Sequence, residues 1–354
     1  MKSIRVIDKD FNLIGEVDCF DSFSHTRRWR GSGGFDLRVE LNDMTRECFK
    51  KDNIIIFDKN PNLVGIVEHA EIDGNGQGDF FAVRGKTLSG LLERRVIVPA
   101  NAETWATEQG KQESIVKNFI TKNCINPTNS KRKIERFEVA PDKGRGKDDK
   151  WRSAYDVLED KLNEICEYSE FGYDVNLDLA NKKFVFDIYE GRDLTVEQSE
   201  LPPVIFSSRF NNILNRKYTE SVMGTYNSVY AGTKEEVGKM VLNYGETEIG
   251  IARRESFLSV SEDTTEAIKK EADNFLEENR EIKTFELEVS PETNFIYGRD
   301  YKLGDLVTIE DRKLKVTMNS RIIEVVENYT GNQRSLTITF DKLIPNLLNK
   351  LRKL

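Results

Sequence analysis

The sequence predicts an α+β fold that is mainly β, with two β-rich parts and an α+β insertion between them. Three observations support this prediction: period-two alternation of apolar residues in the first hundred residues, two amphipathic segments between residues 99 and 200, and a run of short strand-like segments near the end. Alternation at period two buries one face of a strand, whereas apolar spacing of three and four residues buries one face of a helix. A chain of 354 residues is long enough for more than one hydrophobic core.

The strongest strand pattern lies in residues 27–41, which read RRWRGSGGFDLRVEL. Four apolar residues of this stretch alternate with polar ones: Phe35, Leu37, Val39 and Leu41. A phosphate-binding glycine loop opens a helix, whereas Gly33 and Gly34 lead into a strand, so we predict a positive-φ turn there. Further strands are predicted at 53–58, 63–73 and 79–85, followed by a short helix within 86–97.

The middle of the chain alternates helix and strand. Amphipathic helices are predicted at 113–124 and 151–171, and a hairpin with clean alternation is predicted at 173–191. The Leu201-Pro202-Pro203 sequence then indicates a boundary.

The last third returns to β structure. A helix is predicted within 261–282, with Ser261 or Asp263 as its N-cap. Five short strands follow, and this spacing suggests a small barrel or sandwich. Residues 344–354 form an apolar stripe with basic residues, which predicts a helix that docks on the protein or a neighbour.

Composition excludes several classes of protein. No run approaches the roughly 18 apolar residues of a membrane span, and the first residues lack the apolar core of a secretory signal, so we expect assembly in a cytoplasm. The 53 basic and 61 acidic residues give a net charge of −8, which repels nucleic-acid phosphates over most of the surface. Generic binding of DNA is therefore not expected.

Residues suited to metal binding or catalysis are few. Four cysteines without C-x-x-C spacing are expected to be reduced thiols: Cys19, Cys48, Cys124 and Cys166. With only His25 and His69, a zinc site or a histidine-based triad is not expected, and His69 is predicted to pack inside a strand. Asp305 follows a glycine before a strand, and we predict that it accepts backbone hydrogen bonds. We assign no catalytic, cofactor-binding or metal-binding residue, although enzymes that use only carboxylates remain an alternative.

Several segments, taken in order, resemble one family: the tail hub proteins of siphophages and related prophage tails, also called tail-associated or tail-tip proteins. The N-terminal resemblance lies in RRWRGSGGFDLRVEL, IIIFD, GIVEHAEI and VRGKTLSGLLERRVI. The middle resemblance lies in FNNILNRKYTESVMGTYNSVYAG and IARRESFLSVSED, and the C-terminal one in YKLGDLVTI, SRIIEVVENY and SLTITF. The ordered set spans nearly the whole chain.

The family is similar to the trimeric cup of contractile-tail baseplates, in which each subunit contributes two tube-like β-barrels. The resemblance implies a first tube-like barrel at 1–98 completed by strands from 201–222, an α+β insertion domain at 99–200, an α+β peripheral domain at 223–282, and a second tube-like barrel with a C-terminal helix at 283–354. It also makes Arg27, Arg28 and Arg30 candidates for ion pairs between subunits.

By the same resemblance, the chain is a non-enzymatic structural protein of the virion: a homotrimeric hub at the tail tip. Expected neighbours are the distal tail protein, the tail tube, the tape measure protein and receptor-binding or tail fibre proteins, with DNA passing through the ring without specific binding. The chain stops shortly after SLTITFDKL, so the peptidoglycan-cleaving region of many family members is not inherited. A carboxylate-dependent cell-wall hydrolase at the tail tip is the alternative function.

Overall fold

A computed structural model describes residues 2–75, 78–100, 103–232, 242–245, 248–260, 264–289, 294–311, 316–331, 333–341 and 344–345. The chain forms two compact units, one comprising 1–216, 286–340 and 344–354, and the other comprising 217–285 and 341–343. Both are described separately below. The fold is mainly β and contains several sheets, as the sequence predicts.

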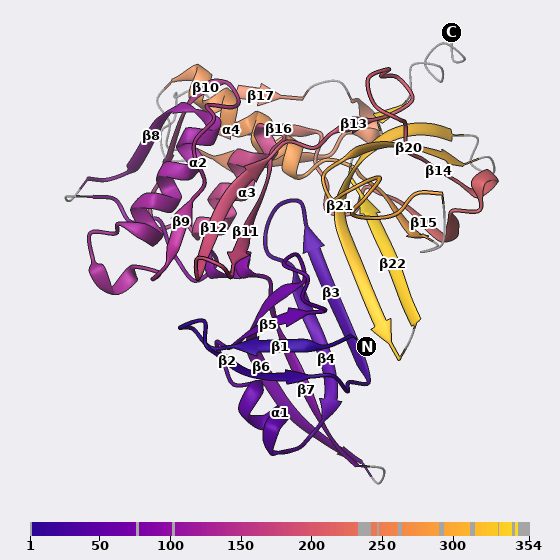
Figure 1. The fold of residues 1–354 in the computed structure, drawn as a ribbon. Helices are drawn as coiled ribbons and strands as arrows, with labels where there is room; N and C mark the ends of the chain where they lie inside the picture. The colour runs from indigo at the N-terminus through magenta and orange to yellow at the C-terminus, as the bar shows by residue number, and fades with distance from the viewer. Residues whose placement is uncertain are drawn as a thin grey trace. The chain divides into compact units, whose positions relative to one another are not determined.

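The first β-rich part of the larger unit is a set of antiparallel strands in the order β3-β4-β7-β6-β5-β1-β2 (Figure 1). Their bounds are β1 Ile4–Ile7, β2 Leu13–Val17, β3 Ser22–Arg28, β4 Gly34–Glu40, β5 Ile54–Phe57, β6 Val64–Asn75 and β7 Gly78–Lys86. The predicted alternation in β4 is confirmed, because Phe35, Leu37 and Val39 are buried in the core of this part. Between β4 and β5 lies α1 (Asp43–Cys48), which begins where Asn42 accepts a hydrogen bond from the Thr45 amide.

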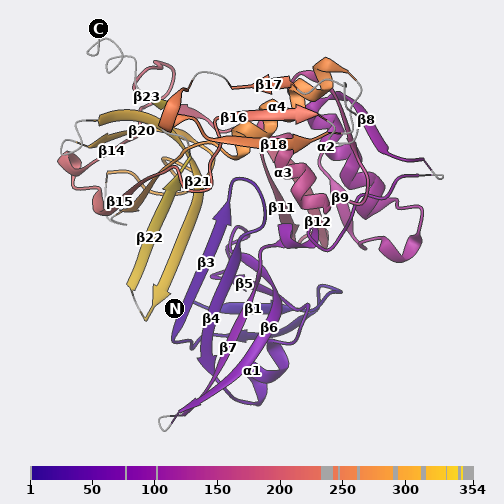
Figure 2. The same ribbon diagram turned by 180° about the vertical axis from the view of Figure 1, so that it is seen from behind.

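The insertion packs two helices and a three-stranded sheet around a second core (Figure 2). After the 3-10 helix η1 (Leu88–Leu91), its elements are β8 Ala106–Lys111, α2 Gln112–Ile120, a π-helical turn Thr121–Ile125, β9 Phe137–Val139, β10 Asp148–Ser153, α3 Leu158–Tyr168, β11 Gly172–Asp178 and β12 Lys183–Tyr189. β11 and β12 form the predicted hairpin, and their inward residues are buried: Tyr173, Val175, Leu177, Phe184, Phe186 and Ile188.

The second β-rich part is built around the long strand β21 (Val316–Thr330). Its other strands are β13 Asp193–Leu194, β14 Ile205–Ser207, β15 Ile213–Ser221, β19 Ile282–Val289, β20 Leu306–Asp311, β22 Gln333–Phe340 and β23 Ile344–Pro345. β14 pairs in parallel with β20, and β15 lies next to β19. Within the chain the strands from 201–222 pair with β19 and β20, and the predicted domain bounds stay a prediction.

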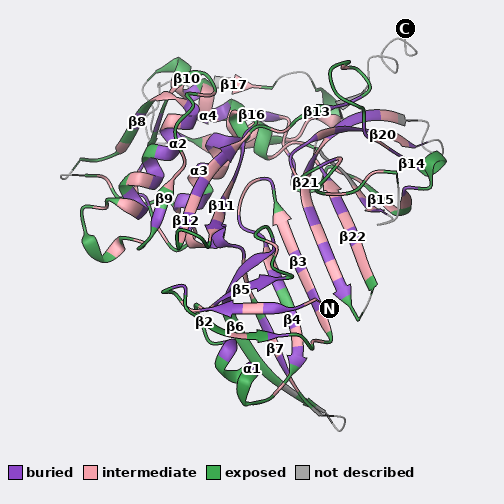
Figure 3. Ribbon diagram, viewed as in Figure 1, coloured by how far each residue is buried: buried purple, intermediate pink, exposed green. Residues whose placement is uncertain are grey.

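β21 joins the two β-rich parts, because its residues 316–321 pair with β20, whereas its residues 324–330 pair with β22 along one edge and with β3 along the other. Half-buried and buried residues alternate along 324–329 of β21 (Figure 3). The main strand order runs from β15 at one end to β2 at the other among the described residues, so closure into barrels stays a prediction.

The smaller unit is a three-stranded sheet covered by one helix. β16 (Ser228–Gly232) pairs antiparallel with β17 (Leu242–Tyr244) and parallel with β18 (Glu255–Ser259). α4 (Thr265–Glu278) packs Ile268 and Ala272 on this sheet. Its N-cap is Thr264, which accepts a hydrogen bond from the Ala267 amide, while Ser261 and Asp263 lie outside the described residues. The predicted C-terminal helix also lies outside them beyond residue 345.

Other expectations from the sequence have mixed outcomes. All four cysteines are free thiols, and Cys19 is exposed whereas the other three are buried. The prediction that His69 packs inside a strand is wrong: its side chain is exposed beside Glu71. The register of β6 shifts between Val67 and His69, and residues 68–72 are exposed on both faces of the strand, so His69 lies beyond the buried part of β6. No helix in the described ranges has the length and apolar content needed to cross a membrane.

Candidate functional site

The glycine-rich stretch ahead of β4 is a turn, as predicted, but its glycines have different roles. Gly31 has the positive φ, at +78°, so the prediction of positive φ at Gly33 and Gly34 is wrong. A Cβ atom on Gly33 would lie 1.9 Å from the Thr26 carbonyl oxygen. Gly33 is therefore required by the close approach of two backbone segments rather than by its φ angle.

Trp29, in the same stretch, connects three parts of the larger unit. Its amide donates to the carbonyl oxygen of Ile323 in β21, at 2.7 Å, and its carbonyl oxygen accepts from the Tyr173 amide in β11, at 3.1 Å. The indole is buried and lies against Gly172 and Gly304, where a Cβ atom would come within 2.3 and 2.0 Å of the ring. Trp29 thus fixes the first β-rich part to the insertion and to the second β-rich part.

The three neighbouring arginines make contacts within the chain, and their expected ion pairs between subunits stay a prediction. Arg27 pairs with Asp174 of β11 at 3.1 Å, and Arg28 pairs with Glu324 of β21 at 2.8 Å. Arg30 donates from Nε to the carbonyl oxygen of Phe171 at 2.9 Å. Like Trp29, these arginines connect the end of β3 and the turn after it to the insertion and to β21.

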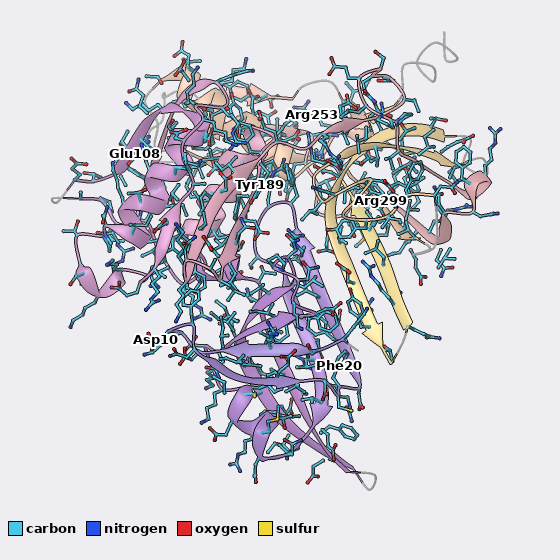
Figure 4. The ribbon with its side chains drawn as sticks, viewed as in Figure 1. Asp10, Phe20, Glu108, Tyr189, Arg253 and Arg299 are labelled. Carbon is cyan, nitrogen blue, oxygen red and sulfur yellow. The ribbon has the colours of Figure 1, made fainter. Side chains whose placement is uncertain are left out.

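A cavity of about 810 Å³ opens beside this junction and is lined from all three parts. Its walls carry charges of both signs, among them Lys2, Arg27, Arg192, Asp305, Glu327 and Arg334. Tyr189, labelled in Figure 4, lines it from the end of β12, and its hydroxyl accepts a hydrogen bond from Asn176 at 2.6 Å.

Glu327 of the cavity is engaged by neighbouring donors. Glu327, which is 5% exposed, accepts hydrogen bonds from the Tyr329 hydroxyl and from Arg334, both at 2.7 Å. Burial, followed by this hydrogen bond to Glu327, raises the pKa of Tyr329 above its usual range. The Lys2 ammonium lies 3.7 Å from the centre of the Tyr329 ring, and burial followed by repulsion from Arg334 lowers the pKa of Lys2. A carboxylate that already accepts from a cation is poorly placed to act as a general base.

Asp305 has the structural role that the sequence predicts. It is 3% exposed, and one of its oxygens pairs with Arg192 at 2.6 Å. It also accepts from the backbone amides of Arg192 and Lys302, at 3.1 and 2.7 Å. These bonds anchor the loop before β20.

A second, smaller pocket of about 410 Å³ contains a pair of carboxyl groups, Glu93 and Glu159. They share a hydrogen bond, and Glu93 also accepts from Ser32 Oγ and Lys86 Nζ. Burial, followed by the charge of Glu93, raises the pKa of Glu159 to about 8. Burial acts to raise the pKa of Glu93, but the hydrogen bonds from Lys86 and Ser32 outweigh it and lower that pKa.

This pair lacks the geometry of a glycosidase. Catalytic carboxyls of glycosidases stand roughly 5 to 10 Å apart with the scissile bond between them, whereas Glu93 and Glu159 contact each other directly. Nor do the described ranges contain a group of three His, Cys, Asp or Glu residues placed to hold a metal ion. The sequence reasoning missed the pair because no local pattern links two glutamates that are far apart in the chain.

Three solved phage tail proteins have a similar fold. The tail protein from Neisseria meningitidis MC58 matches with a TM-score of 0.61 and 13% identity over 96% of both chains. The 43 kDa tail protein of prophage MuSo2 from Shewanella oneidensis matches with a TM-score of 0.62 and 14% identity over 96% of this chain and 98% of that one. Prophage tail protein gp18 from Listeria monocytogenes EGD-e gives a TM-score of 0.51 and 12% identity, over 99% of this chain and 97% of that one. At these identities the likeness shows the fold.

The sequence itself identifies the family. Residues 3–340 match the model of the Siphovirus ReqiPepy6 Gp37-like protein family, and the chain belongs to that family. No curated protein matches the sequence. The resemblance to phage tail proteins drawn from the sequence is therefore confirmed, and the chain is a member of a phage tail structural protein family.

Proposed function

We propose that the chain forms the homotrimeric hub at the distal end of the tail, where it joins the tail tube and distal tail protein to the receptor-binding apparatus. The observation that carries this proposal is the pairing of β3 with β21, which places two β-rich parts in one continuous sheet. Two such parts per chain would give six positions in a threefold ring, which matches a hexameric tube. In this proposal the parts are 1–98 and 283–354 as tube-like domains, with 99–200 and 223–282 outside the ring.

The two ends of the sheet support assembly into a ring. β2 and β15 end the main strand order, and each carries an exposed leucine: Leu13 is 64% exposed and Leu214 is 56% exposed. An exposed edge strand with apolar side chains pairs readily with another chain. Because β2 and β15 are different strands, contact between them in neighbouring copies is head-to-tail, which is the arrangement that closes a ring.

Electron microscopy of assembled tails, together with sedimentation of the purified chain, tests the proposal. We expect threefold symmetry at the distal end of the tail. The variants Leu13→Asp and Leu214→Asp should weaken assembly by placing a charge at the contact, whereas Leu179→Asp is the control. Leu179 is 44% exposed and lies in the insertion, in the turn between β11 and β12. A twofold or fourfold ring, or equal assembly of all three variants, would contradict the proposal.

The proposed ring lets DNA and the tape measure protein pass without holding them. The net charge of −8 supports this part of the proposal, because an acidic wall repels phosphates. The test is a binding measurement with duplex DNA at low and high salt. Tight binding that weakens steeply with salt would refute passage without retention.

The alternative function, a tail-tip cell-wall hydrolase, gains no support from a specific observation. Glu93 and Glu159 contact each other directly, and Asp305 is fixed by Arg192. A zymogram with purified peptidoglycan separates the two functions, and we expect no cleared zone.

A further inference from the structure

The carboxyl pair of the smaller pocket connects two parts of the larger unit. Ser32 belongs to the turn between β3 and β4, and Lys86 ends β7, so both lie in the first β-rich part. Glu159 lies in the first turn of α3, in the insertion. Glu93, which follows η1, contacts all three of these residues. We call Ser32, Lys86, Glu93 and Glu159 the carboxyl latch.

Glu159 is placed unusually for a glutamate. Its side chain is 6% exposed and lines the pocket, and its Oε1 atom is buried without a hydrogen-bond partner. The latch holds two carboxyl groups and one ammonium group, that of Lys86. Two carboxylates in contact repel each other strongly, and one ammonium offsets only one negative charge. If the two carboxyl groups share a single proton, the remaining negative charge equals the positive charge of Lys86. The protonated carboxyl then donates a hydrogen bond to the other carboxylate.

The charged and titratable groups around Glu159 come from every neighbouring element. They are Glu93 after η1, Lys86 of β7, Arg28 and Arg30 beside the turn, and Tyr173 of β11. Arg28 and Arg30 are already engaged by Glu324 and by the Phe171 carbonyl oxygen. The Tyr173 hydroxyl donates to Asn163 of α3 at 2.8 Å. Because these groups are held by other partners, the net charge of the site changes through the proton that Glu93 and Glu159 share.

We propose that the carboxyl latch is a proton-operated switch, which holds the turn at 30–33 against α3 while the pair keeps its shared proton and releases it when that proton is lost. A glutamine at 159 would make the same hydrogen bond without any titration, so the acid makes the contact depend on pH.

The pKa values set the range in which the latch works. The pKa of Glu159 is raised to about 8 in the folded protein from an ordinary value of 4.5. Its contribution to stability is therefore fully present below about pH 4.5 and is lost as the pH rises through about 8. This range includes neutral pH, where a small change in pH alters the fraction of molecules in which the turn at 30–33 is held against α3.

Hydrogen exchange measured by mass spectrometry on the full chain tests the proposal. After correction for the intrinsic rate, exchange in 27–35 and 158–168 should be about tenfold faster near pH 9 than near pH 7. The variant Glu159→Gln should remove this difference. The control Asp160→Asn, on the next residue of α3, is exposed and should keep the wild-type difference.

A second measurement covers the case in which Glu159→Gln fails to fold. Carbon NMR of labelled glutamate in the wild-type chain should show one carboxyl group that ionises between about pH 7 and pH 9. Titration of every glutamate below about pH 6 would overturn the proposal, as would equal pH dependence of exchange in the wild type and Glu159→Gln.

Discussion

A Cβ atom on Gly172 would lie 2.3 Å from Cδ2 of Trp29, so the indole fills the space that any side chain at position 172 would need. Gly172 begins β11, and Trp29 follows β3. The insertion is thus attached to the first β-rich part through a contact that admits only glycine. This contact is the basis of the first prediction.

Gly172→Ala should lower the free energy of unfolding by about 1 to 3 kcal/mol, because the added methyl group displaces a buried ring. Urea denaturation measures the change. The same substitution made together with Trp29→Leu should have a smaller effect, since the smaller side chain leaves room. Additive effects of the two substitutions would show that they do not share a contact.

Gly31→Ala and Gly33→Ala should differ in severity. Gly31 needs its positive φ, and alanine there costs roughly 1 to 2 kcal/mol. Gly33→Ala should cost more, because its Cβ would overlap the Thr26 carbonyl oxygen and force β3 and β4 apart. Thermal melts of the two variants rank them, and the reverse order would contradict this account of the turn.

Arg27→Met should destabilise the protein more than Arg28→Met. Both arginines make an ion pair, but the side chain of Arg27 is 20% exposed and that of Arg28 is 51% exposed. Removal of Arg27 leaves Asp174 without its cation in a half-buried place, whereas an exposed pair contributes at most about 1 kcal/mol. Denaturation at low and high salt measures both, with Arg28→Met as the matched control. Equal losses would show that burial does not decide the strength of these pairs.

Glu113 should make the protein sensitive to acid. It is fully buried at the start of α2 and pairs with Lys117 at 2.7 Å and with Arg145 at 2.9 Å. Burial acts to raise the pKa of Glu113, but the hydrogen bonds from Arg145 and Lys117 outweigh it and hold the pKa well below its usual range. Its stabilising contribution is therefore present above its ordinary pKa of 4.5 and is lost as the pH falls below that value.

The melting temperature of the wild type should fall as the pH drops below about 4.5, and Glu113→Gln should flatten this part of the curve. At neutral pH the variant should lose about 3 to 5 kcal/mol, because two buried cations lose their common partner. Glu135→Gln is the control, since this carboxylate is 75% exposed beside Lys133. An unchanged acid limb in Glu113→Gln would contradict the assignment.

Local patterns in the sequence predicted the elements well where one face of the element is buried. Phe35, Leu37 and Val39 alternate in β4 as predicted, and Asp305 anchors its loop as predicted. The prediction for His69 was wrong because β6 extends beyond the core after Val67, and the local sequence does not show where along a strand the core ends.

The contacts that define the candidate site join residues distant in sequence. Trp29 meets Tyr173 and Ile323, and Glu93 meets Glu159, without any spacing rule that relates them. The arginines show the same limit: the family resemblance suggested ion pairs between subunits, whereas the partners within the chain, Asp174 and Glu324, became visible only in three dimensions. Family resemblance supplied the class of protein, whereas these pairings needed the structure.

The pairing of β3 with β21 has a consequence for synthesis on the ribosome. Arg28 and Glu324 are 296 residues apart, and a ribosome that adds about 5 to 20 residues per second needs roughly 15 to 60 seconds to make that segment. During this interval β4 already offers β3 one partner, but the opposite edge of β3 has to wait for β21. The nascent chain therefore presents an open strand edge for most of its translation, and chaperones that shield such edges would act on this protein before its last strands emerge.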